Sequence, residues 1–543
     1  MITEDQLRSW RAQDPDPATV AELDQLIARA DAGDADAQAE LADAFAGPLT
    51  FGTAGLRGKL GPGPGRMNRV VVAQAAAGLA RYLVNTGQQG RPVIVGYDAR
   101  HNSDVFAADT AEILAGAGLV PLLCARPLPT PVVAFGIKHF GCAAGVVVTA
   151  SHNPPQDNGY KVYLGDGSQI VPPADADIAA QIAIVSAAPI DQIPRSTDYR
   201  RVDAELVDAY VARAAGLVAA DAPRPVRWVY TAMHGVGASV VDAVVKAAGF
   251  DDPHRVTEQI DPDPDFPTVA FPNPEEPGAI DLALALAARV DADIAIANDP
   301  DADRCALAAP FADGWRMLTG DELGILLADD ALRRGTTGTY ACSIVSSTML
   351  SAMAAAHGQP FTTTLTGFKW IGRVPGLAFG YEEAIGYCSD PSAVPDKDGI
   401  TTLVRILALA ASLKAEGRTV ADRLDEIAAT YGVYLNSGLS FRVADLRLIS
   451  EAMARVRTNP PTSLAGEPVT AVDLAEGSAD LPPTDGMAFT GASVRVVVRP
   501  SGTEPKLKCY LQVTAPGELA PARAAAAAKL AQLRSDVTAV LGL

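Results

Sequence analysis

Ser151 follows an apolar run directly, in the segment Gly145-Val-Val-Val-Thr149-Ala-Ser151-His152-Asn153-Pro154-Pro155. Such a run predicts a buried strand, which the two prolines end. Open α/β sheets bind ligands beyond the carboxyl ends of their parallel strands, so Ser151 is a candidate nucleophile. The same Ser-His-Asn-Pro residues also suit a turn with a purely local role.

Alternating aspartates follow a second apolar run, in Asp293-Ile-Ala-Ile-Ala-Asn298-Asp299-Pro300-Asp301-Ala302-Asp303-Arg304. Three carboxylates on one loop suit a hard cation such as Mg²⁺ or Ca²⁺, and a solvated acidic turn is the alternative. An EF-hand is excluded, because its required Gly and Glu are replaced by Arg304 and Pro310. A competing segment, Asp261-Pro-Asp263-Pro-Asp265, lies in a Pro-rich stretch that favours an extended linker.

Phosphate-binding donors gather in a third segment, Val494-Arg495-Val-Val-Val498-Arg499-Pro500-Ser501-Gly502-Thr503-Glu504-Pro505-Lys506-Leu507-Lys508. An arginine, two hydroxyls, two lysines and the amides beside a glycine suit a phosphate dianion, although a surface turn with incidental basic residues has the same composition. The segment is not a Walker A loop, whose pattern is absent. Near the N-terminus, Gly52, Gly55 and Gly58 surround Arg57, so that backbone and guanidinium could approach a ligand together.

Paired acids occur in a fourth segment, Phe379-Gly380-Tyr381-Glu382-Glu383-Ala384-Ile385-Gly386-Tyr387. Carboxylates on a glycine-bracketed loop can accept hydrogen bonds from sugar hydroxyls, and a solvated turn is the alternative. Thr366-Gly367-Phe368-Lys369-Trp370 lies upstream and Asp396-Lys397-Asp398-Gly399 downstream.

Composition narrows the class of ligand. The 543 residues carry 44 Lys and Arg against 64 Asp and Glu, a formal charge of −20. Such a chain repels polyanions, which disfavours nucleic acid and anionic membranes as partners, while a small phosphorylated ligand can bind if basic residues gather at one site. Six scattered cysteines without a Cys-x-x-Cys pair argue against a disulfide framework or a zinc site. We find neither a signal sequence nor a membrane-length apolar run and expect a cytoplasmic protein.

The order of strand-like and helix-like patterns predicts α/β domains in tandem. Residues 1 to about 45 are expected to be helical, and further strand–loop–helix units open near Pro92, Val226 and Tyr340. Gly235-x-Gly237 lacks the third glycine of a dinucleotide fingerprint. We expect four domains around a central cleft, at residues 1–215, 216–313, 314–435 and 436–543. The first three should be α/β domains with mixed sheets, and the last a smaller α+β domain.

Taken together, these motifs resemble the α-D-phosphohexomutase family of phosphoglucomutases and phosphomannomutases, from about residue 48 onward. The resemblance implies that Ser151 carries the transferable phosphoryl group and that Asp299, Asp301 and Asp303 bind Mg²⁺, with phospho-Ser151 as a further ligand. It implies a sugar contact for Glu382 and Glu383. A further set would grip the phosphate that does not react: Arg499, Ser501, Gly502 and Thr503.

The same resemblance suggests Lys161 as general acid or base, and it places Arg57 and His152 in the active site. We expect the pKa of Lys161 to be lowered by neighbouring charges, with His152 as the alternate base. Five further residues in or beside these segments are expected to contact the substrate: Arg304, Thr366, Gly367, Lys369 and Lys397. Ala384 stands where many members carry serine, a variant similar to the subgroup of phosphoglucomutase-2 and phosphopentomutase-like enzymes.

The implied reaction interconverts glucose 1-phosphate and glucose 6-phosphate through a bisphosphorylated intermediate, with Mg²⁺ as cofactor and glucose 1,6-bisphosphate as activator. Mannose phosphates and pentose phosphates are the alternative substrates. Two other classes stay open: a phosphosugar-binding regulatory protein without turnover, and a phosphatase in which an aspartate is the nucleophile. The sequence predicts no oligomeric state.

Overall fold

A computed structural model describes residues 2–443, 445, 447–479, 481–501 and 506–542. The chain forms two compact units. The first comprises residues 1–308 and 387–412, and the second comprises residues 309–386 and 413–543. The first unit holds a six-stranded sheet and most of a five-stranded sheet. The second holds most of a four-stranded sheet and another five-stranded sheet.

The N-terminal residues form three helices, as the sequence predicts: α1 (Glu4–Gln13), α2 (Pro17–Asp31) and α3 (Ala35–Ala44). Side chains of Thr3, Asp16 and Asp34 accept hydrogen bonds from free amides in the first turns, which fixes where each helix begins. Trp10 is buried and meets the Phe45 ring edge to face at 6.0 Å. The helices therefore form a small packed layer of their own.

The first sheet has the order β1-β5-β4-β2-β3-β6. Its strands are β1 (Leu56–Lys59), β2 (Pro92–Tyr97), β3 (Val120–Cys124), β4 (Ala144–Val148), β5 (Asp157–Leu164) and β6 (Arg200–Val202). Strands β4, β2, β3 and β6 pair in parallel, and β4–β5 and β5–β1 are antiparallel. Every residue of β4 is buried, as expected where helices cover both faces.

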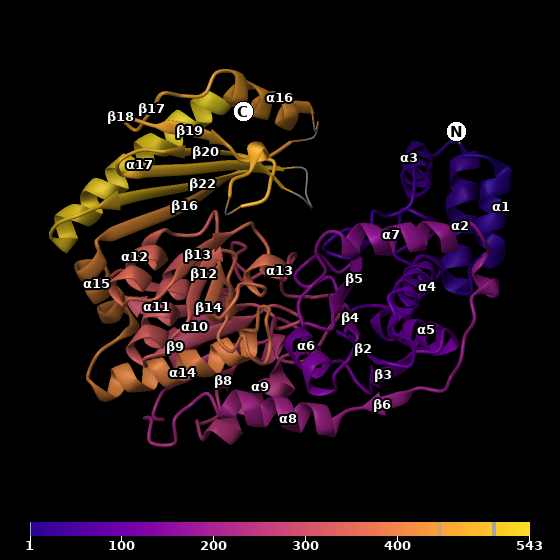
Figure 1. Cartoon of the computed structure of the whole chain (residues 1–543), viewed down its shortest axis with the longest axis horizontal. Helices are drawn as coiled ribbons and strands as arrows, with labels where there is room; N and C mark the ends of the chain where they lie inside the picture. The colour runs from indigo at the N-terminus through magenta and orange to yellow at the C-terminus, as the bar shows by residue number, and fades with distance from the viewer. Residues whose placement is uncertain (1, 444, 446, 480, 502–505, 543) are drawn as a thin grey trace. The chain divides into compact units, whose positions relative to one another are not determined.

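Helices of this first domain follow its strands: α4 (Arg69–Asn85), α5 (Ser103–Gly116), α6 (Thr130–His139), α7 (Ala174–Val185), the 3₁₀ turn η1 (Ile190–Gln192) and α8 (Ala204–Ala215). Figure 1 shows α4 and α7 side by side. Gly78 of α4 permits this approach, because an added Cβ would come within 2.4 Å of Ile182.

The second sheet has the order β11-β10-β9-β7-β8. Its elements are β7 (Trp228–Thr231), α9 (Ala238–Ala248), β8 (His254–Arg255), the 3₁₀ turn η2 (Thr257–Gln259), α10 (Asp281–Arg289), β9 (Ile294–Asn298), β10 (Cys305–Phe311) and β11 (Gly314–Met317). Strand β7 is parallel to β8 and β9, whereas β10 is antiparallel to β9. The β9–β10 connection is the loop with three aspartates.

The third sheet has the order β13-β12-β14-β15, with β12 parallel to both β13 and β14. Its strands are β12 (Thr339–Ser343), β13 (Phe361–Thr364), β14 (Leu377–Glu382) and β15 (Gly386–Cys388). The accompanying helices are α11 (Gly320–Arg333), α12 (Met349–Ala356), α13 (Phe368–Ile371), α14 (Gly399–Ala415) and α15 (Val420–Tyr431).

The C-terminal sheet is antiparallel at each of its pairings, in the order β16-β22-β21-β20-β19. Its elements are β16 (Val433–Arg442), α16 (Arg447–Thr458), the β17 (Ser463–Leu464) and β18 (Glu467–Pro468) pair, β19 (Thr470–Asp473), η3 (Leu474–Glu476), β20 (Met487–Thr490), β21 (Val494–Pro500), β22 (Lys506–Ala515) and α17 (Leu519–Leu541). Helices α16 and α17 cover one face of this sheet (Figure 1).

This architecture confirms the predicted fold class of α/β domains followed by a C-terminal α+β domain. All six cysteines are buried and have free thiols. No helix in the described part of the chain has both the length and the apolar character that a membrane span requires. The four boundaries expected from the sequence stay a prediction.

Candidate active site

Ser151 lies just past the end of β4 and is buried. Its amide donates to Thr149 Oγ1 at 2.8 Å, and its φ of 51° is left-handed, a conformation that side-chain-bearing residues rarely adopt. The Ser151 hydroxyl donates to Asp299 Oδ2 at 2.7 Å and lies 3.4 Å from His152 Nδ1. The predicted nucleophile and the predicted metal loop thus meet, although 148 residues separate them.

The loop after β9 points Asp299, Asp301 and Asp303 to one place, where one oxygen of each lies within 4.8 Å of the others. Ala302 has a left-handed φ of 53°, which turns the chain between the second and third aspartates. All three side chains are fully buried. Among the described residues, Asp301 Oδ1 and Asp303 Oδ1 have no hydrogen-bond partner. Buried carboxylate oxygens without partners are costly, so this donor set fits a hard cation.

Lys161 joins two of these carboxylates. Its Nζ donates to Asp301 Oδ2 at 2.6 Å and to Asp303 Oδ2 at 2.9 Å. Burial alone would lower the pKa of Lys161, but the two carboxylates outweigh it and raise that pKa. The prediction that neighbouring charges lower the pKa of Lys161 is therefore wrong, because the nearest charges are negative.

His152 lies beside the Ser151 hydroxyl and has its pKa lowered well below the ordinary value. Burial is the main cause, and the cationic side chains of Arg304 and Arg57 add to it. A neutral imidazole keeps one nitrogen able to accept a proton. His152 thus has the protonation state that a base requires.

Arg57 lies on edge strand β1, which pairs with β5. Its Nη1 donates to Asn153 Oδ1 at 3.0 Å, which ties the N-terminal glycine loop to the Ser151 loop. Gly55 permits the approach, because a Cβ there would lie 1.8 Å from the Tyr160 carbonyl oxygen. The glycines around Arg57 therefore allow close backbone packing, as the sequence suggests.

Behind β1, the N-terminal helices hold the loop that connects it to α4. The Gly65 amide donates to the Ala44 carbonyl at 2.9 Å, and Arg66 pairs with Asp43 at 2.6 Å. A Cβ on Gly63 would lie 2.7 Å from the Ala44 oxygen. The end of α3 thus holds the loop that follows the strand carrying Arg57.

Two more predicted substrate residues lie beside the aspartates. Arg304 donates its amide to Asp299 Oδ1 at 3.0 Å, and its Nε is 3.8 Å from Asp303 Oδ1. Lys397 Nζ lies 3.5 Å from Asp303 Oδ2. Burial would raise the pKa of Asp303, but Lys161, Lys397 and Arg304 hold it below the usual range. Lys397 thus helps to balance the charge of the metal loop.

Gly235 and Gly237 have a structural use that the sequence analysis missed. A Cβ on Gly235 would lie 2.3 Å from Pro300 Cα, and one on Gly237 would lie 3.1 Å from the Ala302 Cβ. The Val236 amide donates to the Pro300 carbonyl at 2.8 Å. These glycines let the β7–α9 loop pack directly against the metal loop.

Glu382 and Glu383 differ in their surroundings. Glu382 ends β14 and is buried. Glu383 Oε2 accepts from Ser343 Oγ at 2.9 Å and from Ser346 Oγ at 3.2 Å, and the Glu383 amide donates to Ser346 Oγ at 3.1 Å. Glu383 is thus held by two serines of its own domain.

Asp321, in the first turn of α11, supports the same loop: its Oδ1 accepts from the Ser347 amide at 2.6 Å and from the Tyr381 hydroxyl at 2.9 Å. Burial raises the pKa of Asp321 to about 7, and Glu383 adds to the rise, while the Ser347 and Tyr381 hydrogen bonds and Arg495 oppose it. The sequence analysis did not single out Asp321.

This raised pKa predicts a dependence of stability on pH. The folded chain keeps the Asp321 proton up to about pH 7, whereas the unfolded chain releases it near pH 4. As pH rises between these values, this group therefore lowers the free energy of unfolding, by at most about 4 kcal/mol. Asp321→Asn keeps both acceptor contacts and cannot ionise. We expect urea unfolding to show that the variant gains stability relative to the wild type between pH 4.5 and 8. A constant difference would contradict the assignment.

The predicted phosphate loop is described in part. Arg499 Nη1 donates to Thr366 Oγ1 at 2.6 Å, so two predicted substrate residues from different sheets meet. Gly367 has a φ of 104°, and Lys369 begins the short helix α13 with Phe368. The Ser501 amide donates to the Lys506 carbonyl at 2.8 Å. Gly502 and Thr503 lie outside the described residues.

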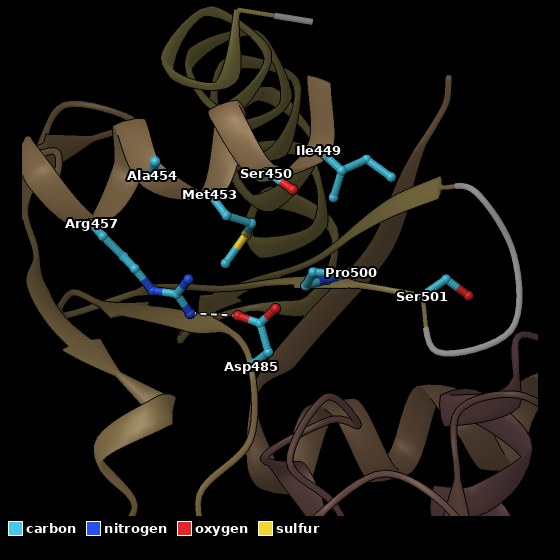
Figure 2. Close-up of a pocket in the computed structure, with 8 residues that line it drawn as sticks. All are labelled: Ile449, Ser450, Met453, Ala454, Arg457, Asp485, Pro500 and Ser501. Atoms are coloured by element: carbon cyan, nitrogen blue, oxygen red, sulfur yellow. Dashed lines mark hydrogen bonds and ion pairs between the residues drawn. The ribbon is translucent and has the colours of Figure 1, made fainter. Parts of the chain in front are cut away.

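Pro500 and Ser501 also line a cavity of about 420 Å³ whose opposite wall is α16 (Figure 2). Arg457 extends from α16 and forms ion pairs with Asp485 and Asp473. The cavity leaves open space between α16 and the segment of Pro500 and Ser501.

The predicted residues fall into two groups. The first unit contains Ser151, His152, Lys161, Arg57, the three aspartates, Arg304 and Lys397. The second contains Thr366, Gly367, Lys369, Glu382, Glu383, Arg499 and Ser501. The first group brings together a serine hydroxyl, three carboxylates and an imidazole, and the second holds carboxylates and hydrogen-bond donors of the kind that bind phosphate. These are the kinds of functional group that phosphoryl transfer to a sugar requires.

Comparison with known proteins agrees with this chemistry. The sequence matches all four domains of one family, phosphoglucomutase/phosphomannomutase: α/β/α domain I at residues 48–188, domain II at 208–310, domain III at 319–431 and the C-terminal domain at 440–530. A probable phosphomannomutase of Haemophilus influenzae is 49% identical over 82% of this chain and 92% of its own.

Human phosphopentomutase is 34% identical over 93% of this chain and 90% of its own. The crystal structure of a putative phosphomannomutase from Thermus thermophilus superposes with a TM-score of 0.69 at 25% identity, covering 89% of this chain and 99% of that one. The chain therefore belongs to the phosphoglucomutase/phosphomannomutase family of phosphosugar mutases.

Proposed function

We propose that phospho-Ser151 transfers its phosphoryl group to a free hydroxyl of a sugar monophosphate and recovers a phosphoryl group from the other end of the resulting bisphosphate. The observation that carries this proposal is the 2.7 Å hydrogen bond from Ser151 Oγ to Asp299, within a buried cluster of three aspartates. A serine oxygen that forms an ester with phosphate requires both a cation nearby and a route for its proton.

Asp299, Asp301 and Asp303 would hold Mg²⁺, whose chemistry when bound is to neutralise charge on the transferring phosphoryl group. His152, 3.4 Å from the Ser151 hydroxyl, would accept the Ser151 proton when the serine is rephosphorylated, and Lys161 would orient Asp301 and Asp303. Arg57 and Arg304 lie where they can offset the negative charge of a phosphate.

In the second unit, Glu382 and Glu383 would accept hydrogen bonds from sugar hydroxyls. The non-reacting phosphate would lie at Arg499, Ser501, Gly502 and Thr503, with Thr366 and Lys369 beside it. Because the sugar must present each end in turn, this set has to bind a phosphate at either position.

Glucose 1-phosphate is the substrate we propose first. Mannose and pentose phosphates are kept because of two relatives, one named as a probable phosphomannomutase and the other as a phosphopentomutase. Ala384 next to Glu383 removes one hydroxyl that could contact the sugar and leaves the choice to experiment. We further propose that the protein acts in the cytoplasm.

The test is phosphate migration on a panel of glucose, mannose and ribose 1-phosphates, with Mg²⁺ and a trace of glucose 1,6-bisphosphate. We expect primer-stimulated conversion of one sugar that EDTA stops. Release of inorganic phosphate would favour a phosphatase, and binding without conversion would favour a regulatory protein.

A further inference from the structure

We infer that Arg100 is a positioning residue for phosphoryl transfer: its guanidinium ties down the loop that carries Ser151 and so holds the serine hydroxyl at Asp299. The inference rests on the proposed function, because it assigns Arg100 a part in the transfer step at Ser151. Arg100 lies in the loop after β2, the strand that pairs with β4.

The Arg100 side chain donates hydrogen bonds to four backbone carbonyls of the Ser151 loop. Arg100 Nη2 donates to the carbonyls of Ser151 at 2.7 Å and Asn153 at 2.5 Å. Its Nη1 donates to those of Pro154 at 2.9 Å and Asp157 at 3.1 Å. Backbone carbonyls in an irregular, buried loop need hydrogen-bond donors, and here the planar guanidinium of Arg100 supplies them.

Arg100 is itself fixed on two sides. Its Nε lies 3.4 Å from Asp98 Oδ2, and its guanidinium carbon lies 4.9 Å from the centre of the Phe266 ring. Asp98 Oδ1 in turn accepts from the Arg100 amide at 3.0 Å and from Ser103 Oγ at 2.8 Å. The anchor is therefore rigid, as a tether for a strained loop must be.

The loop is strained at Ser151, whose φ of 51° is left-handed. Residues with a side chain keep such a conformation only where their surroundings enforce it. The tethers to the Ser151 and Asn153 carbonyls lie on either side of His152, so their loss would let the serine relax away from Asp299. Asn153 also accepts from Arg57, so the same loss would disturb a second active-site contact.

Direct substrate binding by Arg100 is excluded by burial. Only 1% of its side chain is exposed, and both terminal nitrogens point to loop carbonyls. Its effect must therefore act through Ser151.

The test is Arg100→Lys, which keeps the charge but cannot span four carbonyls with one ammonium. Ser151 phosphorylation by ³²P-labelled glucose 1,6-bisphosphate is followed by rapid quench, and steady-state kcat and KM are measured on the same protein. We expect the labelling rate and kcat to fall about 100-fold, the cost of a small misplacement of a reacting group, with KM unchanged.

Arg405→Lys is the matched control. Arg405 is also buried in the first unit, and its Nη1 donates to the Leu217 carbonyl at 2.7 Å. This variant should lose stability comparably and keep the wild-type labelling rate. Equal loss in both variants, or wild-type labelling in Arg100→Lys, would overturn the inference. Absence of labelling in the wild type would instead overturn the proposed function.

If Arg100→Lys does not fold, as judged by thermal unfolding, Phe266→Leu replaces it. This change removes the ring that fixes one side of the guanidinium and so loosens its hold on the four carbonyls. Phe266 has a left-handed φ of 46°, which leucine would share, so the backbone cost is matched. We expect the labelling rate to fall about fivefold, which corresponds to the loss of one cation–π contact. An unchanged rate would overturn the inference.

Discussion

Ser151→Ala should abolish mutase turnover while leaving the fold intact. The hydroxyl oxygen is the atom that would carry the phosphoryl group, and alanine has no oxygen to take its place. Alanine fits the buried site and loses one hydrogen bond to Asp299, a cost of about 1 kcal/mol. Conversion of the preferred sugar 1-phosphate and thermal unfolding are measured together.

Ser168→Ala is the control for this prediction. Ser168 is equally buried, and its hydroxyl donates to the Pro395 carbonyl at 3.2 Å, away from the aspartates. It should keep wild-type turnover. Full activity in Ser151→Ala would contradict the phosphoserine mechanism. Phosphate mapped to Asp299 or Asp301 by mass spectrometry would favour the phosphatase.

Asp301→Asn should weaken Mg²⁺ binding by about 100-fold or more and reduce turnover at any fixed Mg²⁺ concentration. The substitution removes one of three charges and leaves an amide where Oδ1 now has no partner. Calorimetric titration of the chelator-treated protein with Mg²⁺ measures the affinity. In the wild type, Mg²⁺ should raise the unfolding temperature, since it binds the folded chain, and this rise should be lost in the variant.

Asp265→Asn provides the comparison for the metal prediction. Asp265 belongs to the other run of aspartates, and 74% of its side chain is exposed. It should bind Mg²⁺ and turn over like the wild type. A loss of affinity there equal to that in Asp301→Asn would place the metal in the Pro-rich segment instead.

Local patterns predicted the strands that end before Ser151 and Asp299, and the strand that contains Arg499, because each is largely apolar and is followed by polar or proline residues. The contacts that assemble the site join distant parts of the chain, and no local pattern reports them. Arg100 and Gly235 were missed for this reason: one meets the Ser151 loop, and the other meets Pro300. The amino-acid composition does not indicate either contact.

The error about Lys161 has the same origin. Its charge neighbours could not be known before the fold placed Asp301 and Asp303 beside it. The paired glutamates were likewise treated as equivalent, although Ser343 and Ser346 engage only Glu383 among the hydrogen bonds described. Residue type predicted which functional groups these positions carry, whereas their hydrogen-bond partners depend on tertiary contacts.

The packing of α3 against the loop before α4 has a practical consequence for protein engineering. Gly63, Gly65 and Arg66 contact the end of α3. The strand that precedes this loop, β1, carries Arg57. A shortened version that starts at residue 48, where the family match begins, would expose this glycine loop to water and remove its backbone partners. Expression designs and domain swaps should therefore keep residues 4–44 together with the domain that carries Ser151.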